Sequence, residues 1–217
     1  MTNPETSGVE LPEMDLLRKF DVPAPRYTSY PTADRFHAGF GVEDYKRALA
    51  GRKDEKEPAD LSLYVHVPFC NDVCYYCGCN KIVTRDHSKS AEYIETIGKE
   101  AELVKEVITG SMELKQLHFG GGTPSYLGTK RLVKILKTIL KKYKVDKQAE
   151  ITLEANPDSA GDWKELRTLR RCGFNRLSLG VQSVVEGELR ALGRLHTAAE
   201  AMACVEAARE AGFANLS

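Results

Sequence analysis

Short apolar runs alternate with segments of helical period along most of the chain. Residues 61–68 are mostly apolar and end in Pro68, which predicts a buried strand. Further runs predict strands over 117–119, 150–154 and 174–181. Between the strands, apolar residues recur every three to four positions, as on one face of a helix. This period predicts helices over 88–109, 128–143, 160–171 and 197–211.

Strands that alternate with helices indicate βα units, and consecutive βα units build a parallel sheet. About four such units are expected between residues 59 and 217. The last residues, 213–217, look like the opening of a fifth strand. Because a strand in this position would have no covering helix, we expect the chain to be a fragment of a longer protein.

The first 58 residues follow a different pattern. The stretch Val22–Pro31 contains three prolines, which fix φ and remove backbone donors, so an extended loop is expected. Residues 42–50 predict a short helix, and a charged run begins at Gly51. We therefore expect two parts, an N-terminal arm with a charged linker over 1–58 and a core of βα units over 59–217.

Composition narrows the class of protein. Apolar residues make up 42% and charged residues 29%, as in ordinary soluble globular proteins. Lys and Arg total 31, as do Asp and Glu, so the basic excess typical of nucleic-acid binding is lacking. No uncharged apolar run approaches the roughly 18–20 residues that cross a bilayer. The polar, acidic N-terminus does not resemble a secretory signal. We expect a cytoplasmic protein with no nucleic-acid or membrane partner.

Four cysteines, Cys70, Cys74, Cys77 and Cys79, lie within ten residues after the first predicted strand. In a reducing compartment such a group indicates metal binding rather than disulfides. The spacing Cys70-x3-Cys74-x2-Cys77 can hold three irons of a [4Fe–4S] cube and leave the fourth iron open to a ligand. Cys79 could replace one of the three, because spacing alone does not decide. Zinc is the alternative, but structural zinc sites usually add a second ligand pair, and no second Cys or His pair follows here.

This spacing, with Tyr76 before the third cysteine, resembles the signature of the radical S-adenosylmethionine (SAM) superfamily. The resemblance implies a TIM-like, partial (β/α) barrel with its chemistry at the carboxyl ends of the strands. It also implies that SAM binds at the open iron and is cleaved reductively to methionine and a 5′-deoxyadenosyl radical. The cysteine loop follows the first predicted strand and so is expected at such an end.

Other polar groups also follow predicted strands. Gly120-Gly-Gly-Thr-Pro124 resembles the superfamily motif that holds the amino group of SAM, although a tight turn also explains it. Glu154 ends the third strand, where a carboxylate can bind ribose hydroxyls or cap a helix. Gln182 ends the fourth strand. Arg194 can pair with a carboxylate or lie on the surface. Their common position beyond strand ends favours a single site.

Four longer motifs narrow the resemblance. They are Arg26-Tyr-Thr-Ser-Tyr-Pro-Thr32, Cys77-Gly-Cys-Asn-Lys81, Gly120-Gly-Gly-Thr-Pro124 and Gly173-Phe-Asn-Arg-Leu-Ser-Leu-Gly-Val-Gln182. Together they look like the oxygen-independent coproporphyrinogen III oxidase family. The resemblance implies oxidative decarboxylation of two propionates of coproporphyrinogen III to vinyl groups, giving protoporphyrinogen IX in haem synthesis. It also implies an electron donor, whose identity the sequence does not give, and a monomer.

In that family, two SAM molecules bind beside the [4Fe–4S] cluster. By motif match, the cluster ligands are Cys70, Cys74 and Cys77. The residues expected to hold the first SAM are Tyr64, Gly121 and Glu154. The residues expected to contact the second are Tyr76, Gly122, Thr123, Gln182 and Arg194. Cys79 matches a family cysteine that is not a cluster ligand.

Two segments depart from the family pattern. Glu154-Ala-Asn-Pro157 and Leu192-Gly-Arg-Leu-His196 look more like a related branch of radical-SAM-like haem chaperones, which bind haem without turnover. That branch usually lacks the fourth cysteine and the arm motif, and both are present here, so the oxidase is favoured. A haem-degrading relative is a third alternative. Because the missing barrel strands and C-terminal domain would supply part of the substrate pocket, we expect this chain to assemble a cluster without turning over coproporphyrinogen.

Overall fold

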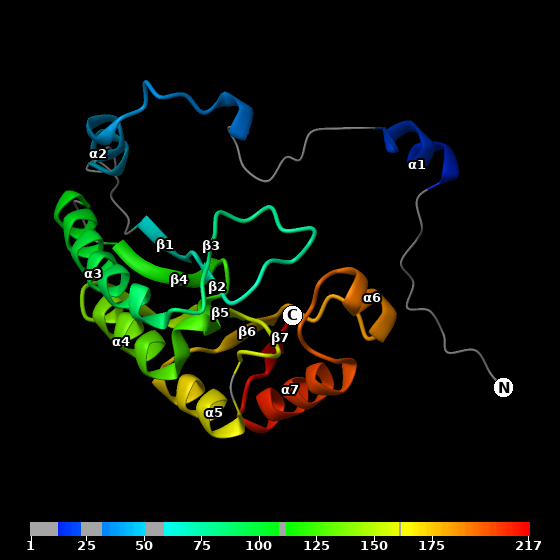
Figure 1. Ribbon diagram of the computed structural model, residues 1–217. Helices are drawn as coiled ribbons and strands as arrows, with labels where there is room; N and C mark the ends of the chain where they lie inside the picture. Colours follow the sequence, from blue (N-terminus) through cyan, green and yellow to red (C-terminus); the bar gives the residue numbers. More distant parts are fainter. Residues whose placement is uncertain (1–12, 23–31, 51–58, 109–111, 161) are drawn as a thin grey trace. The chain divides into compact units, whose positions relative to one another are not determined.

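A computed structural model describes residues 13–22, 32–50, 59–108, 112–160 and 162–217 (Figure 1). The chain divides into two compact units, Met1–Tyr45 and Lys46–Ser217. The first contains helix α1 (Met14–Phe20) and the short 3-10 helix η1 (Ala33–Arg35). Helix α2 (Val42–Ala50) confirms the helix expected there. Residues 23–31, with most of the arm motif and the proline-rich stretch, and linker residues 51–58 lie outside the described residues.

The second unit contains the parallel sheet that the alternation of strands and helices predicts. Its strands are β1 (Ala59–Val67), β4 (Met112–Gly121), β5 (Lys144–Ala155), β6 (Arg176–Leu179) and β7 (Asn215–Leu216). They lie in the order β1-β4-β5-β6-β7, and every neighbouring pair is parallel. The sheet is open, with β1 and β7 at its edges, so the unit is a partial (β/α) barrel, as expected.

Strand boundaries differ from the expected ones where polar residues alternate with apolar ones. Strands β4 and β5 begin earlier than the strands predicted from the apolar runs. Their first halves carry charged side chains such as Lys115 and Asp146, so no apolar run marks them. Strand β6 is shorter than the run 174–181. It ends at Leu179, where the chain begins to turn: the N–H of Val181 donates to the Leu179 carbonyl at 2.8 Å, and Gln182 has φ of +67°.

Four helices cover one face of the sheet (Figure 1), and we call this the outer face. They are α3 (Ser90–Val107), α4 (Gly128–Leu140), α5 (Trp163–Cys172) and α7 (Ala198–Glu210). Each confirms a predicted helix, with ends shifted by a few residues. The side chain of Asp162 caps α5, and Thr197 and Glu200 form a capping box on α7. A short helix, α6 (Glu186–Ala191), was not predicted.

The core lies between the outer face and these helices. Alternate residues of each strand point into it, including Leu117, Phe119, Leu153 and Leu177, all almost fully buried. Phe119 meets Phe174 edge to face, with ring centroids 5.2 Å apart. The residues between them point to the opposite, inner face. They are Ser62, Tyr64, His66, Gln116, His118, Glu150, Thr152, Glu154, Arg176 and Ser178.

A small second sheet holds the cysteine segment at the carboxyl end of β1. It pairs β2 (Phe69–Cys70) with β3 (Ile82–Val83) in parallel. After β3, the 3-10 helix η2 (His87–Lys89) leads into α3, and η3 (Pro124–Leu127) leads from β4 into α4. The loop between β2 and β3 therefore begins and ends on paired strands.

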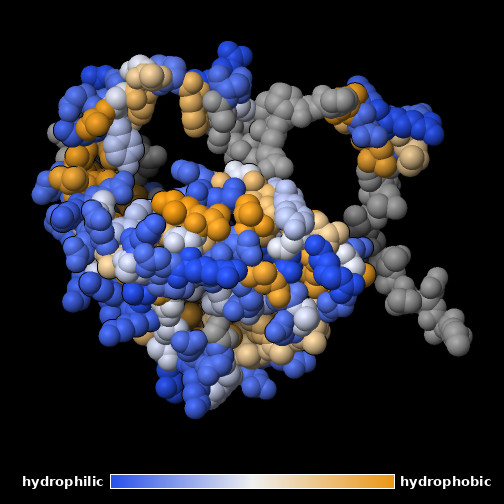
Figure 2. All heavy atoms as spheres, viewed as in Figure 1, coloured by the Kyte–Doolittle hydropathy of each residue, from blue (hydrophilic) through white to orange (hydrophobic). Residues whose placement is uncertain are grey.

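The surface in Figure 2 is mostly hydrophilic, with hydrophobic residues in separate groups between hydrophilic ones. Several exposed large hydrophobic side chains belong to loops near the cysteines, among them Val73, Tyr75, Val184 and Leu195. Within the part of the chain that the structure describes, no helix is both long and apolar enough to cross a membrane.

Candidate functional site

The cysteine loop is anchored by backbone hydrogen bonds on both sides. The N–H of Ile82 donates to the carbonyl of Pro68 at 2.7 Å, and the N–H of Thr84 donates to that of Cys70 at 2.9 Å. On the other side, the N–H of Gly122 donates to the carbonyl of Val67 at 2.8 Å. Cys70 is consequently buried, whereas Cys74 and Cys77 are half-buried and Cys79 is exposed. All are free thiols.

Each of the three predicted ligands has a hydrogen-bonding neighbour at its sulfur. The Sγ of Cys70 lies 3.3 Å from the Thr123 hydroxyl. The guanidinium of Arg194 donates to the Sγ of Cys74 at 2.9 Å. Cys77 interacts with Cys79 and with the Lys81 ammonium. The three thiols are thus individually oriented by different elements of the fold.

These surroundings shift the acidities of the thiols in different directions. Burial raises the pKa of Cys70, and the Thr123 hydroxyl partly offsets this. Burial also raises the pKa of Cys77, but hydrogen bonds from the Cys79 backbone and side chain and from Lys81 outweigh it. The net pKa of Cys77 therefore lies below its usual value. A lowered thiol pKa favours the thiolate, the form that binds metals.

The glycine run after β4 lets the backbone pass close to the cysteines. Gly121 has φ of +117°, a conformation that residues with a side chain rarely adopt. A Cβ on Gly122 would lie 2.7 Å from the Pro68 carbonyl oxygen and 2.9 Å from the Sγ of Cys70. The run is therefore more than a tight turn, because a side chain at Gly122 would collide with a predicted cluster ligand.

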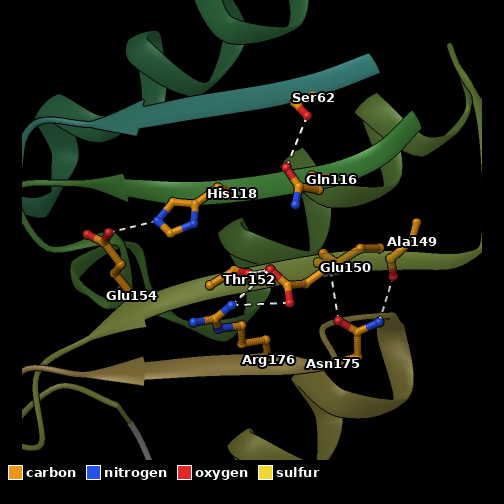
Figure 3. Close-up of polar contacts among 10 residues, drawn as sticks. Ser62, Gln116, His118, Ala149, Glu150, Thr152, Glu154, Asn175 and Arg176 are labelled. Carbon is orange, nitrogen blue, oxygen red and sulfur yellow. Dashed lines mark hydrogen bonds and ion pairs between the residues drawn. The ribbon is translucent and has the colours of Figure 1, made fainter. Parts of the chain in front are cut away.

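On the inner face, Tyr64, His118 and Glu154 form a contiguous group. The ring of Tyr64 stacks on that of His118 at 5.7 Å between centroids. The Nε2 of His118 lies 2.7 Å from the Glu154 carboxylate, as Figure 3 shows. Burial, followed by the nearby Glu154 charge, raises the pKa of Tyr64. Glu154 is 40% exposed, so its carboxylate is open to a ligand.

Arg194 joins three parts of the site. Besides Cys74, its guanidinium donates to the Oδ1 of Asn156 at 2.8 Å and to the carbonyl of Gly180 at 2.6 Å. Its Nε is buried without a partner among the described residues. Burial raises the pKa of the Tyr76 hydroxyl, and the neighbouring Arg194 guanidinium partly offsets this. Arg194 is thus not a surface residue, and the two segments that depart from the family pattern meet through Arg194 and Asn156.

Gln182 has backbone strain, because a positive φ is uncommon for a residue with a side chain. Its amide lies near Gly180, where a Cβ would be 3.5 Å from the Gln182 Nε2. The same Cβ would lie 2.7 Å from the Asn156 Oδ1. Such strain at a strand end is typical of functional sites.

The structure thus brings the predicted site residues together at the carboxyl ends of β1, β4, β5 and β6. It adds residues that the sequence analysis did not single out, chiefly His118, Asn156 and Lys81. A period of two along β4 and β5 could have indicated the first two, because His118 shares a face with Gly120, and Asn156 follows Glu154 at the same spacing.

The donor set fits a [4Fe–4S] cluster. In a cube, each thiolate binds a different iron, so the three sulfurs need not converge on one point. Among the described residues, no three His, Cys, Asp or Glu side chains lie as ligands of a single metal ion. The three cysteines, the hydrogen bonds to the sulfurs of Cys70 and Cys74 and the close glycine backbone together match what a cluster and a small bound cofactor require.

Comparisons with known proteins agree with this geometry. The model of the radical SAM superfamily matches residues 64–217. The chain belongs to the radical SAM superfamily, whose members use SAM and a [4Fe–4S] cluster.

Comparisons with individual proteins point to a narrower group within the superfamily. The chain is 40% identical over 207 residues to an oxygen-independent coproporphyrinogen III oxidase of Pseudomonas aeruginosa, covering 94% of this chain and 44% of that protein. It is 39% identical to the Escherichia coli protein of that name, covering 93% of this chain and 43% of the relative. The solved E. coli coproporphyrinogen III oxidase, described as a radical SAM enzyme, matches with a TM-score of 0.80 and 37% identity, over 93% of this chain and 44% of that one. The chain spans less than half the length of these relatives.

Proposed function

We propose that this chain carries the cluster-binding and SAM-binding part of an oxygen-independent coproporphyrinogen III oxidase. The substrate would be coproporphyrinogen III, and the reaction would be oxidative decarboxylation of two of its propionates to vinyl groups during haem synthesis, each losing a hydrogen atom to the 5′-deoxyadenosyl radical, CO2 and one electron. The observation that carries the proposal is the hydrogen-bonded attachment of Cys70 and Cys74 to Thr123 and Arg194 at the strand ends. The similarity to named oxidases supports the choice of substrate.

In this proposal, Cys70, Cys74 and Cys77 hold the [4Fe–4S] cluster, and Cys79 does not. When bound and reduced, the cluster and SAM would supply a carbon-centred radical that removes hydrogen from the substrate. The rest of the chemistry depends on how the chain binds and orients its ligands. The Thr123, Arg194 and Lys81 side chains would offset the negative charge of the thiolates.

Two groups of residues would bind two SAM molecules. Tyr64, Gly121 and Glu154 would hold the first, with the half-exposed Glu154 carboxylate accepting hydrogen bonds from ribose hydroxyls. The residues that would contact the second SAM are Tyr76, Gly122, Thr123, Gln182 and Arg194. Because Arg194 already donates to Cys74, Asn156 and Gly180, a carboxylate bound to it would replace or share one of these contacts.

The proposal includes the organisation of the chain. Residues 1–58 would form an N-terminal arm and linker, and residues 59–217 would form the radical SAM core. We also propose a monomer that works in the cytoplasm with an electron donor from outside the chain.

The cluster assignment is tested by anaerobic reconstitution of this chain with iron and sulfide. We expect about four irons and four sulfides per chain. Cys77→Ala should lose most of this iron, whereas Cys79→Ala, the matched control two residues away, should retain it. Zinc without acid-labile sulfide, or equal losses in both variants, would contradict the assignment.

The substrate assignment is tested by joining this chain to the part of the P. aeruginosa relative that it does not cover. With SAM and a reductant, the chimera should release CO2 from coproporphyrinogen III and form methionine and 5′-deoxyadenosine. A folded, cluster-loaded chimera that binds SAM and one haem but releases no CO2 would instead support a haem chaperone.

A further inference from the structure

Two of the predicted cluster thiols are connected through three side chains. Cys70 Sγ lies 3.3 Å from Thr123 Oγ1, and Asn156 Nδ2 lies 3.4 Å from the same hydroxyl oxygen. On its other side, Asn156 Oδ1 accepts from Arg194 Nη2 at 2.8 Å, and Arg194 Nη1 donates to Cys74 Sγ at 2.9 Å. Side chains from the segments that follow β4, β5 and α6 thus link Cys70 to Cys74, with Asn156 in the middle.

The direction of each hydrogen bond follows from the chemistry of the groups. A guanidinium can only donate, so the Asn156 atom that faces Arg194 must be the amide oxygen. The Asn156 NH2 group then faces Thr123 and donates to its hydroxyl oxygen. Because this oxygen accepts from Asn156, the single hydroxyl proton of Thr123 remains available for the Sγ of Cys70.

We propose that Asn156 is a positioning residue that makes Thr123 and Arg194 donate hydrogen bonds to the thiolates of Cys70 and Cys74, and that it thereby raises the reduction potential of the cluster. The inference rests on the proposed function, in which these cysteines hold the cluster. Hydrogen bonds to the sulfurs are one of the factors that set the potentials of iron–sulfur clusters. Reduction adds negative charge, and donors at the sulfurs stabilise the reduced state.

The amide matters because neither aspartate nor alanine can do both tasks. A carboxylate at position 156 would still accept from Arg194, but it would also accept the Thr123 proton and withdraw it from Cys70. Alanine would leave both Thr123 and Arg194 without their shared partner. Asn156→Asp is therefore expected to reverse one hydrogen bond with little change in side-chain size.

The test is a redox titration of the reconstituted chain, followed by the electron paramagnetic resonance signal of the reduced cluster, without SAM. Asn156→Asp should shift the midpoint potential to more negative values. Asn156→Ala should shift it in the same direction by a smaller amount, because no charge is added. Circular dichroism and iron content establish that each variant is folded and loaded.

Variants at Thr123 separate hydrogen bonding from added charge. Thr123→Val removes the hydroxyl at nearly constant volume and should also lower the potential, whereas Thr123→Ser should restore it to the wild-type value. In the Thr123→Val background, Asn156→Ala should shift the potential less than it does in the wild type. Asn156 would then act on the cluster only through Arg194 and Cys74, because the hydroxyl between it and Cys70 is absent. Thr152→Val is the matched control, since this buried threonine on β5 bonds to Glu150 and should leave the potential unchanged.

The outcomes distinguish the inference from the proposed function. A wild-type chain that takes up no iron and sulfide would overturn the proposed function and this inference with it. A loaded wild type whose Asn156→Asp and Thr123→Val variants keep the same potential would overturn the inference alone. Loss of cluster from the Asn156 variants, with a normal potential in loaded Thr123→Val, would also overturn it, because Asn156 would then act on assembly only.

Discussion

The two faces of the parallel sheet are built from alternating residues of the same strands, yet they have opposite character. On the outer face, Leu117, Phe119 and Leu153 are almost fully buried under the helices. On the inner face, the neighbouring residues His118 and Glu154 form a hydrogen-bonded pair and are partly exposed. Figure 3 shows further polar pairs along the same face, among them Glu150 with Arg176.

This difference separates stability from chemistry within single strands. Burial of apolar area on the outer face supplies the main favourable free energy of folding. The inner face can then carry polar groups that a ligand can reach, because they are not needed to fill the core. The interiors of closed (β/α) barrels are commonly filled by branched apolar side chains. The polar inner face here indicates a surface for binding rather than for packing.

The largest effect is expected for Phe119→Ala on the outer face. This side chain is fully buried and packs against Phe174, so its loss should lower the free energy of unfolding by about 3–5 kcal/mol. His118→Ala, the adjacent residue on the inner face, should change stability by less than about 1 kcal/mol. Urea denaturation followed by circular dichroism measures both. Equal losses in the two variants would remove the distinction between the faces.

The next effect concerns the carboxyl end of β4, where the two faces meet the cysteine loop. In Gly122→Ala, the new Cβ would press on the Pro68 backbone and on Cys70, so we expect a loss of about 1–3 kcal/mol together with most of the cluster iron. Gly187→Ala on α6 is the control, because a Cβ there meets nothing within 4 Å. It should be neutral or stabilise the helix slightly. Full iron loading of Gly122→Ala would show that the close approach is not required.

The sequence predicted the outer face better than the inner one. Apolar runs mark β1, β4, β5 and β6 and the four covering helices, because burial selects apolar residues at regular spacing. Helix α6 was not predicted, since its six residues contain one buried side chain, Leu189, and a single buried residue makes no periodic pattern. The first halves of β4 and β5 were not predicted either, because their charged residues interrupt the apolar runs.

The site was predictable where its signal is local. The cysteines are close in sequence, and the glycine run is continuous, so both stand out locally, and the resemblance to the superfamily motifs rests on them. The hydrogen bond from Arg194 to Cys74 joins residues 120 positions apart, and no local pattern contains it. The role of Asn156 likewise depends on which strand ends are neighbours, which only the sheet order reveals.

A third prediction compares two carboxylates on the inner face of one strand. Glu154 lies at the carboxyl end of β5, whereas Glu150 lies two pleat repeats earlier on the same face and pairs with Arg176 at 3.1 Å. If Glu154 binds the ribose of SAM, Glu154→Gln should weaken SAM binding roughly tenfold or more, as for loss of a charged hydrogen bond. Glu150→Gln should leave SAM affinity unchanged and reduce stability by about 1 kcal/mol at most. Calorimetric titration of the reconstituted chain with SAM checks both, and equal affinities would remove Glu154 from the site.

The smallest effect is expected at the opposite end of the inner face, where Lys115 pairs with Asp146 at 2.5 Å and with Glu113 at 3.4 Å. The hydrogen bond from Lys115 lowers the pKa of Asp146, and bonds from Lys144 and Lys115 lower that of Glu113. A carboxyl whose pKa is lowered by folding stabilises the fold above its ordinary value of roughly 4, and this contribution disappears as the pH falls through the folded pKa. Lys115→Met should therefore lower the urea midpoint at pH 7, and its difference from the wild type should shrink between pH 5 and about pH 3. The exposed Lys137 of α4 gives the control, since Lys137→Met should show no such pH dependence. A difference for Lys115→Met that persists at low pH would mean that packing of the lysine stem, rather than its charge, stabilises this end of the sheet.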